Sequence, residues 1–92
     1  MLKITLTSKA QSDLEALHER YSIHAGSRAA NRVVLEILES LEPLRTFSGL
    51  GRPSQSPDIR EFVFTRYPYV APYRVANGQL QILRVLHQRT DR

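Results

Sequence analysis

Four side chains close to the end of the chain could act on a phosphate or bind an anion. They are Arg84, His87, Arg89 and Arg92, within the stretch ILRVLHQRTDR at residues 82–92. A histidine can exchange a proton near neutral pH, and guanidinium groups hold phosphate or carboxylate oxygens through paired hydrogen bonds. The cluster could therefore cleave a phosphodiester or dock an acidic partner. Alternatively, His87 could be a structural hydrogen-bonding group at the end of a strand.

The positive charge of the chain is concentrated in its second half. Residues 1–44 carry five basic and six acidic side chains, a net charge of −1. Residues 45–92 carry eight arginines, three acidic side chains and no lysine, a net charge of +5. Because arginine presents a planar fork to carboxylates and phosphates, this bias indicates an acidic or phosphate-bearing partner. The arginine preference of a GC-rich genome is the alternative explanation.

Tyrosines alternate with arginines in the stretch RYPYVAPYR. By strand alternation Tyr69 and Tyr73 share one face, whereas Arg74 points to the other. Aromatic rings beside guanidinium groups can stack on bases or grip a peptide. The structural alternative is that these tyrosines line the edge of a core and their hydroxyl groups reach water.

The elements that position these groups begin with a strand and two helices. Residues 2–7 alternate apolar and polar side chains, which is typical of a half-buried strand. Ser8 and Gln11 have the spacing of a capping box, which predicts a helix start at Ser8. An apolar stripe at helical spacing predicts a second helix over residues 28–41, and Pro43 prevents its continuation.

The second half of the chain reads as a loop followed by three strands. Residues 48–58 are rich in glycine, proline and serine and predict the loop. Strands are expected at residues 59–66, 67–75 and 79–87. Asn-Gly at positions 77 and 78 predicts a type I′ turn between the last two.

The fold class predicted by this order is α+β. One domain spans residues 1–92, with the order β-α-α-β-β-β and two antiparallel helices packed on an antiparallel sheet. Pro68 and Pro72 predict an interrupted or bulged middle strand, because neither residue can donate a hydrogen bond to a neighbour. Arg84 lies among apolar residues of the last strand, where Glu61 is the internal partner that we expect.

Composition excludes several classes of site. The chain has no cysteine and only three scattered histidines, so we expect no metal and no cofactor. The sequence contains no apolar run of the roughly 20 residues that a membrane span needs, and its first residues do not form a secretory signal. We therefore expect a cytoplasmic protein without a membrane partner.

Several motifs together resemble the RelE/ParE superfamily of bacterial type II toxins, most closely its ParE branch. These motifs are AQSDLEAL, GLGRP, IREFVF, YPYVAPYRV and LQILRVLHQR. The resemblance implies a toxin that is neutralised by an antitoxin whose acidic C-terminal tail is disordered when free. It also implies that DNA is contacted only indirectly, through the antitoxin.

Two activities occur in this superfamily, and the residues favour inhibition of DNA gyrase over cleavage of mRNA on the ribosome. Ribosome-dependent nucleases resemble one another in an arginine after the tyrosine of the middle strand, whereas Val70 follows Tyr69 here. The alternative is an endoribonuclease with His87 as acid or base and with Arg84 and Arg89 as phosphate clamps. A plain nucleic-acid-binding module is a third hypothesis, disfavoured because the second helix exposes three glutamates.

We expect the arginines of the last three strands to form one cationic platform for an anionic protein. The residues expected to contact antitoxin or target are Arg60, Arg66, Tyr69, Tyr73, Arg74, Arg84, His87, Arg89 and Arg92.

Overall fold

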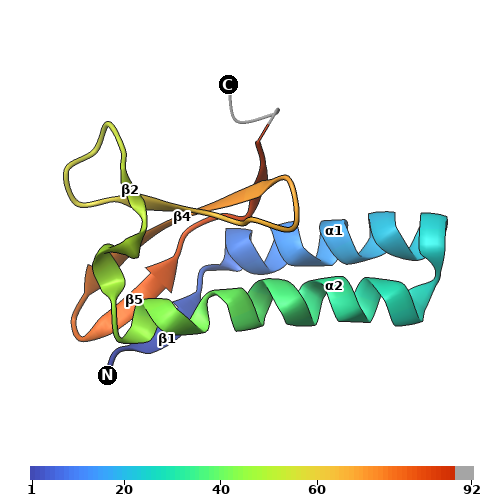
Figure 1. Ribbon diagram of the computed structural model, residues 1–92, viewed down its shortest axis with the longest axis horizontal. Coiled ribbons are helices and arrows are strands. Elements are labelled where there is room, and N and C mark those ends of the chain that lie inside the picture. Colours follow the sequence, from blue (N-terminus) through green and yellow to red (C-terminus); the bar gives the residue numbers. More distant parts are fainter. Residues whose placement is uncertain (89–92) are drawn as a thin grey trace.

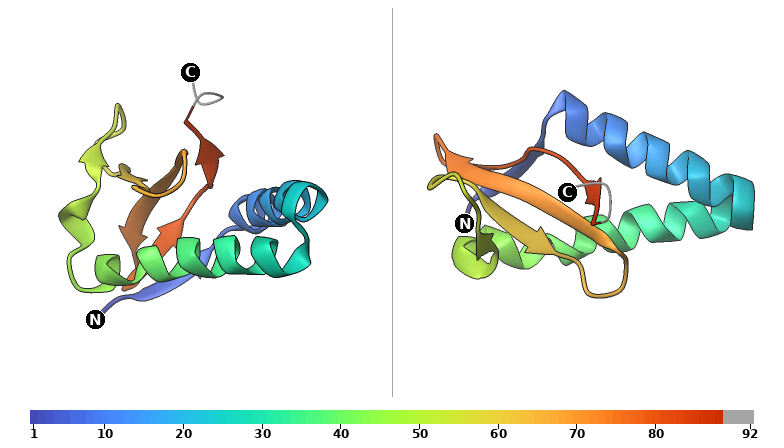
Figure 2. Two further views of the ribbon diagram at one scale, coloured as in Figure 1. Left: turned by 45° about the vertical axis from the view of Figure 1, so that its right-hand side comes forward. Right: turned by 90° about the horizontal axis from the view of Figure 1, so that it is seen from above.

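A computed structural model describes residues 1–88 of the chain as a helical hairpin packed on one face of a sheet (Figures 1 and 2). The helices are α1 (Ser8–Ala25) and α2 (Ser27–Ser40), followed by the 3-10 turns η1 (Glu42–Arg45) and η2 (Ser48–Leu50). The strands are β1 (Lys3–Leu6), β2 (Arg52–Pro53), β3 (Arg60–Val63), β4 (Tyr69–Ala76), β5 (Gln79–Ile82) and β6 (Leu86–His87). The predicted α+β class, with two helices on a sheet, is confirmed.

Thr7, and not Ser8, caps the first helix. The Thr7 hydroxyl accepts a hydrogen bond from the N–H of Ala10 at 3.1 Å and donates one to the carbonyl of Leu83 at 2.8 Å. The predicted capping box of Ser8 and Gln11 is wrong by one position. Thr7 takes the cap because one hydroxyl serves the start of α1 and also joins the end of β1 to the last part of the chain.

The two helices are separated by Gly26 alone, which has a φ of 90°. Glycine tolerates this positive φ, so the chain can reverse within one residue and the helices can pack side by side. The second helix agrees with its predicted bounds to within one residue at each end. The apolar side chains that the pair buries are Ala10, Leu14, Leu17, Ala30, Val33 and Ile37.

The sheet is mixed and not antiparallel. Its order is β1-β5-β4-β3-β2, and β6 pairs with β4. β1 runs parallel to β5, whereas the other pairs are antiparallel. Parallel neighbours require a long connection, which the helical hairpin and the segment after it supply. The alternation within one strand carries no information about the direction of its neighbour, so the predicted antiparallel sheet was wrong for this pair.

The last predicted strand is broken in two. β5 ends at Ile82, β6 begins at Leu86, and the N–H of Leu83 donates to the carbonyl of Pro72 at 2.8 Å. The break places Val85 in the core together with Leu80 and Ile82, which strict alternation would forbid. The interruption expected in the middle strand therefore falls on its neighbour instead.

The hairpin between β4 and β5 forms at the predicted turn. Asn77 has a φ of 54° and Gly78 a φ of 72°, the signs that a type I′ turn requires. Residues of alternate strand positions then face the helices, with Tyr73, Leu80 and Ile82 buried in the core.

Within residues 1–88, no helix is both long and apolar enough to cross a membrane.

Candidate functional site

His87 lies on β6 directly opposite Tyr69 of β4. The two residues are register partners, and their rings meet edge to face with centroids 5.4 Å apart. This pairing depends on the break after β5, because Tyr73 pairs with Ile82 whereas Tyr69 pairs with His87, so the break shifts the register by one residue. The histidine predicted as a candidate acid, base or contact residue is therefore packed against a tyrosine of the core edge.

Arg20 of α1 completes this cluster from the helical side. Its guanidinium group donates to the Tyr69 hydroxyl at 3.2 Å. Tyr69 is 3% exposed, and burial raises its pKa despite the opposing positive charge of Arg20. The phenol is therefore neutral at physiological pH and acts as a hydrogen-bonding group. A hollow of about 220 Å³ opens beside it, lined by Arg20, Tyr21, His24, Pro68, Tyr69 and His87.

Asp13 of α1 is the partner of Arg84. The Nε of Arg84 donates to Asp13 Oδ2 at 2.8 Å, and a terminal nitrogen donates to Oδ1 at 3.1 Å. The N–H of Val85 also donates to Oδ2, at 2.9 Å. The predicted partner Glu61 is wrong: Glu61 pairs with Arg52 at 2.9 Å. The break between β5 and β6 brings Arg84 against α1, which strand alternation could not reveal.

The pKa of the Asp13 carboxyl lies below its ordinary value. Burial by itself raises this pKa, but the hydrogen bonds from Arg84 and Val85, together with the charges of Arg84 and Lys9, outweigh burial. Asp13 is therefore a carboxylate throughout the physiological pH range. Its function in the fold is to fasten the segment between β5 and β6 onto α1.

A second hollow of about 550 Å³ extends the first along α1. The two share Arg20, Tyr69 and His87 and therefore adjoin each other, and together we call them the α1–β6 groove. The groove combines aromatic walls with cationic groups, which suits a partner that offers both apolar and acidic side chains. The second hollow is lined by Asp13, Ala16, Leu17, Arg20, Tyr69, Arg84, Val85, Leu86 and His87.

Sequence reasoning missed the contribution of α1 to this groove. Asp13, Arg20 and His24 are not among the residues that the sequence predicted as contacts. Their spacing of seven and four residues does place them along one stripe of a helix, which is the signal that could have found them. Only the folded chain shows that this stripe lies against β6.

The described arginines of the last three strands do not form one platform of free cations, because Arg66 and Arg84 are each paired with a carboxylate. Within residues 1–88, Arg45 and Arg52 also have carboxylate partners. Arg60 donates to the carbonyl of Gly51 at 2.8 Å, and Arg74 donates to Gln81 at 3.0 Å. Arg89 and Arg92 lie outside the described residues. The four ion pairs are Arg45 with Glu42, Arg52 with Glu61, Arg66 with Glu36, and Arg84 with Asp13.

Tyr69 and Tyr73 share one face, as alternation predicts, and both side chains are buried. The Tyr73 hydroxyl donates to the carbonyl of Ser48 at 2.6 Å and accepts from the N–H of Gly51 at 2.9 Å. Tyr73 therefore supports the loop above it from within the core, and its hydroxyl does not end in water. Of the two tyrosines, Tyr69 is the one that lines the α1–β6 groove.

Residues 1–88 contain no group of three or more histidine, aspartate or glutamate side chains placed to share a metal ion.

Comparison with known proteins assigns the family. The family model described as the ParE toxin of the type II toxin–antitoxin system parDE matches residues 4–92. The chain therefore belongs to the ParE toxin family, and the resemblance drawn from its motifs is confirmed.

Individual relatives agree with this assignment. "Putative toxin Y4kP" of Sinorhizobium fredii (strain NBRC 101917 / NGR234) is 37% identical over 59 residues, which is 64% of this chain and 60% of that protein. A chain of the chromosomal ParDE TA system from P. aeruginosa is 36% identical with a TM-score of 0.86, over 95% of this chain and 96% of that one. The conserved hypothetical protein HP0894 from Helicobacter pylori shares the fold, with a TM-score of 0.58 at 22% identity over 97% of both chains.

Proposed function

We propose that this type II toxin inhibits DNA gyrase by binding to it and that a cognate antitoxin neutralises it. The observation that carries the proposal is the likeness to the P. aeruginosa ParDE chain, which extends over nearly the whole of both chains. A likeness of this extent at 36% identity supports a shared mode of action as well as a shared fold.

The contacts of the candidate catalytic groups support action by binding. Arg84, the first expected phosphate clamp, directs two of its nitrogens at Asp13. His87 packs on Tyr69, and Val70 is buried where nucleases of this fold resemble one another in an arginine. A phosphodiester transition state needs several groups placed to stabilise its negative charge, and these contacts use those groups for the fold.

The target contact that we propose centres on the α1–β6 groove and on the last residues of the chain. Arg20, Tyr69 and His87 would meet the target in the groove, and Arg89 and Arg92 continue the sequence beyond His87. Arg60, Arg66 and Arg74 are exposed and remain candidate contacts of either partner. Arg84 would act indirectly, by fixing the wall of the groove to α1.

The antitoxin that we propose has an acidic C-terminal tail that is disordered until it binds. A chain with a net charge of +4 attracts such a tail, and the tail gains order as its carboxylates find arginines. DNA is then contacted through the antitoxin. The toxin would act in the cytoplasm, where gyrase and its DNA are found.

Two assays on the purified chain test the proposed activity. We expect inhibition of gyrase supercoiling with accumulation of cleaved DNA, and recovery of supercoiling when the antitoxin is added. A translating ribosome extract should retain intact mRNA at the same toxin concentration. Cleavage of mRNA that disappears in His87→Ala would instead establish the endoribonuclease.

A further inference from the structure

Two large apolar side chains, three positions apart in the chain, are exposed at the turn η2. Phe47, just before the turn, is 63% exposed, and Leu50, at its end, is 56% exposed. Val75 of β4 is also half exposed, and it shares a hollow with Ser48 and Gly49 of the same turn. Such a group of apolar side chains at one end of a small protein marks a site of interaction more often than an isolated exposed residue does.

The exposed pair is held rigidly. The N–H of Phe47 donates to the carbonyl of Pro43 at 2.9 Å. The N–H of Leu50 donates to the carbonyl of Phe47 at 3.1 Å. From below, the buried Tyr73 hydroxyl bonds Ser48 and Gly51. A partner therefore meets apolar side chains whose backbone is already ordered, which reduces the entropy lost on binding.

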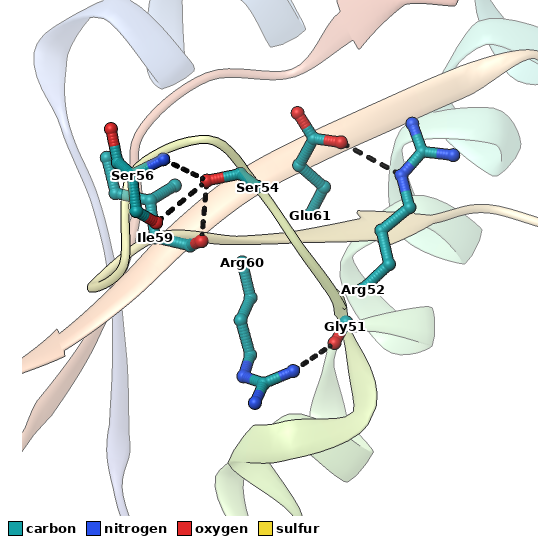
Figure 3. A network of polar contacts seen from close by, with 7 residues as sticks. All are labelled: Gly51, Arg52, Ser54, Ser56, Ile59, Arg60 and Glu61. Carbon is teal, nitrogen blue, oxygen red and sulfur yellow. Dashed lines mark hydrogen bonds and ion pairs between the residues drawn. The ribbon is translucent and has the colours of Figure 1, made fainter.

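Two arginines line the hollow beside the turn, and the guanidinium group of Arg74 bonds Gln81 of β5. Arg60 points toward Gly51 and bonds its carbonyl, whereas Glu61 and Arg52 meet on the other side of the strand (Figure 3). Arg60 and Arg74 line a hollow of about 400 Å³ next to η2. Within residues 1–88 neither arginine forms an ion pair with a carboxylate, and Asp58 is the one acidic residue in the lining of this hollow. The local charge is therefore positive.

We propose that Phe47, Leu50, Arg60, Arg74 and Val75, here called the η2 surface, dock an acidic amphipathic segment of the antitoxin. The inference rests on the proposed function, because it names where the neutralising partner binds. Apolar side chains of the segment would cover Phe47, Leu50 and Val75, and its carboxylates would meet the two arginines.

Charge selects this occupant over a second copy of the chain. A symmetric contact through the η2 surface would bring the same positive groups of both copies together, and like charges oppose such a contact. Nucleic acid would satisfy Arg60 and Arg74 but would leave the aliphatic side chains of Leu50 and Val75 without a matching apolar partner. An acidic segment with apolar residues satisfies both parts of the surface.

The test measures antitoxin affinity by titration calorimetry for four forms of the chain. We expect the double variant Phe47→Ser with Leu50→Ser to bind the antitoxin about tenfold or more weakly than wild type. Arg74→Glu should also weaken binding, and its effect should diminish at high salt. The control is Leu35→Ser on α2, because Leu35 is also 56% exposed but lies outside the η2 surface; we expect its affinity to equal that of wild type.

The outcomes separate this inference from the proposed function. Thermal unfolding followed by circular dichroism identifies the variants that fold, and Arg74→Glu keeps the test valid should the double variant unfold. Folded variants that bind the antitoxin as tightly as wild type would overturn the η2 surface alone. Failure of wild type to bind would overturn the neutralisation proposal instead. Self-association that the double variant abolishes would show that a second copy occupies the surface, which also overturns the inference.

Discussion

The carboxylate of Asp13 and the guanidinium group of Arg84 form a two-point contact across 71 positions of sequence, at 2.8 and 3.1 Å. The same carboxylate accepts the N–H of Val85. One side chain of α1 thus holds the segment that joins β5 to β6, and with it the position of His87 beside Tyr69. The geometry of the α1–β6 groove depends on this contact.

Asp13→Asn should destabilise the fold. The amide retains one oxygen but turns an N–H donor toward the donors of Arg84 or Val85, so a hydrogen bond is lost in a partly buried site. We expect a decrease of about 1–3 kcal/mol in the free energy of unfolding, measured by urea denaturation at neutral pH. The control is Asp58→Asn, at an exposed position, which should change it by less than about 0.5 kcal/mol. Equal effects of the two substitutions would contradict the structural function of Asp13.

The stability difference between wild type and Asp13→Asn should shrink on acidification. The folded pKa of Asp13 lies below its ordinary value of 3.8, so the carboxylate contributes stability above that value and loses it as pH falls through the folded pKa. The asparagine does not titrate. Urea denaturation of both proteins from pH 7 down to about 3 checks this expectation, and a difference that stays constant over the range would contradict it.

Gly51→Ala should destabilise the loop that carries the η2 surface. A Cβ at this position would lie 2.6 Å from the ring of the buried Tyr73 and 2.9 Å from the carbonyl oxygen of Glu61. Neither group can move freely, so we expect the free energy of unfolding to decrease by about 1–3 kcal/mol, measured by thermal or urea denaturation. Gly49→Ala is the matched control, because a Cβ there meets nothing within 4 Å. A tolerated alanine at position 51 would mean that Tyr73 does not support the loop as described.

Tyr67 should ionise at higher pH than an ordinary tyrosine. Its hydroxyl donates to the carboxylate of Glu36, and that hydrogen bond, followed by burial and the negative charge of Glu36, raises its pKa. The neutral phenol therefore stabilises the fold below the ordinary pKa of 10.0, and this contribution is lost as pH rises through the folded pKa. Ultraviolet titration of tyrosine ionisation measures the change. Two tyrosines, Tyr67 and Tyr69, should ionise late, so Tyr67→Phe should reduce the late component and leave the part due to Tyr69. Glu36→Gln should shift the Tyr67 part to lower pH, and an unchanged titration in both variants would refute the assignment.

Parts of the fold and of the site could be predicted from the sequence because they depend on the conformational preferences of neighbouring residues. Asn77 and Gly78 tolerate the positive φ of a tight turn, and the apolar stripe over residues 28–41 repeats at helical spacing. The side of the sheet to which Tyr69 and Tyr73 point follows from strand alternation. The resemblance to the family followed from short motifs in α1, at η2 and β2, and in the strands that follow.

The sequence alone determined the two helices and the order in which helices and strands follow one another, the turn between β4 and β5, and the concentration of arginine in the second half of the chain. Tertiary structure decided which groups each arginine contacts, where β1 pairs, and that α1 forms one wall of the groove beside His87. The physical reason is the distance along the chain over which each interaction acts. Turn and helix preferences act between residues a few positions apart, whereas the contact of Arg84 with Asp13 exists only after the break at residues 83–85 brings two distant segments together.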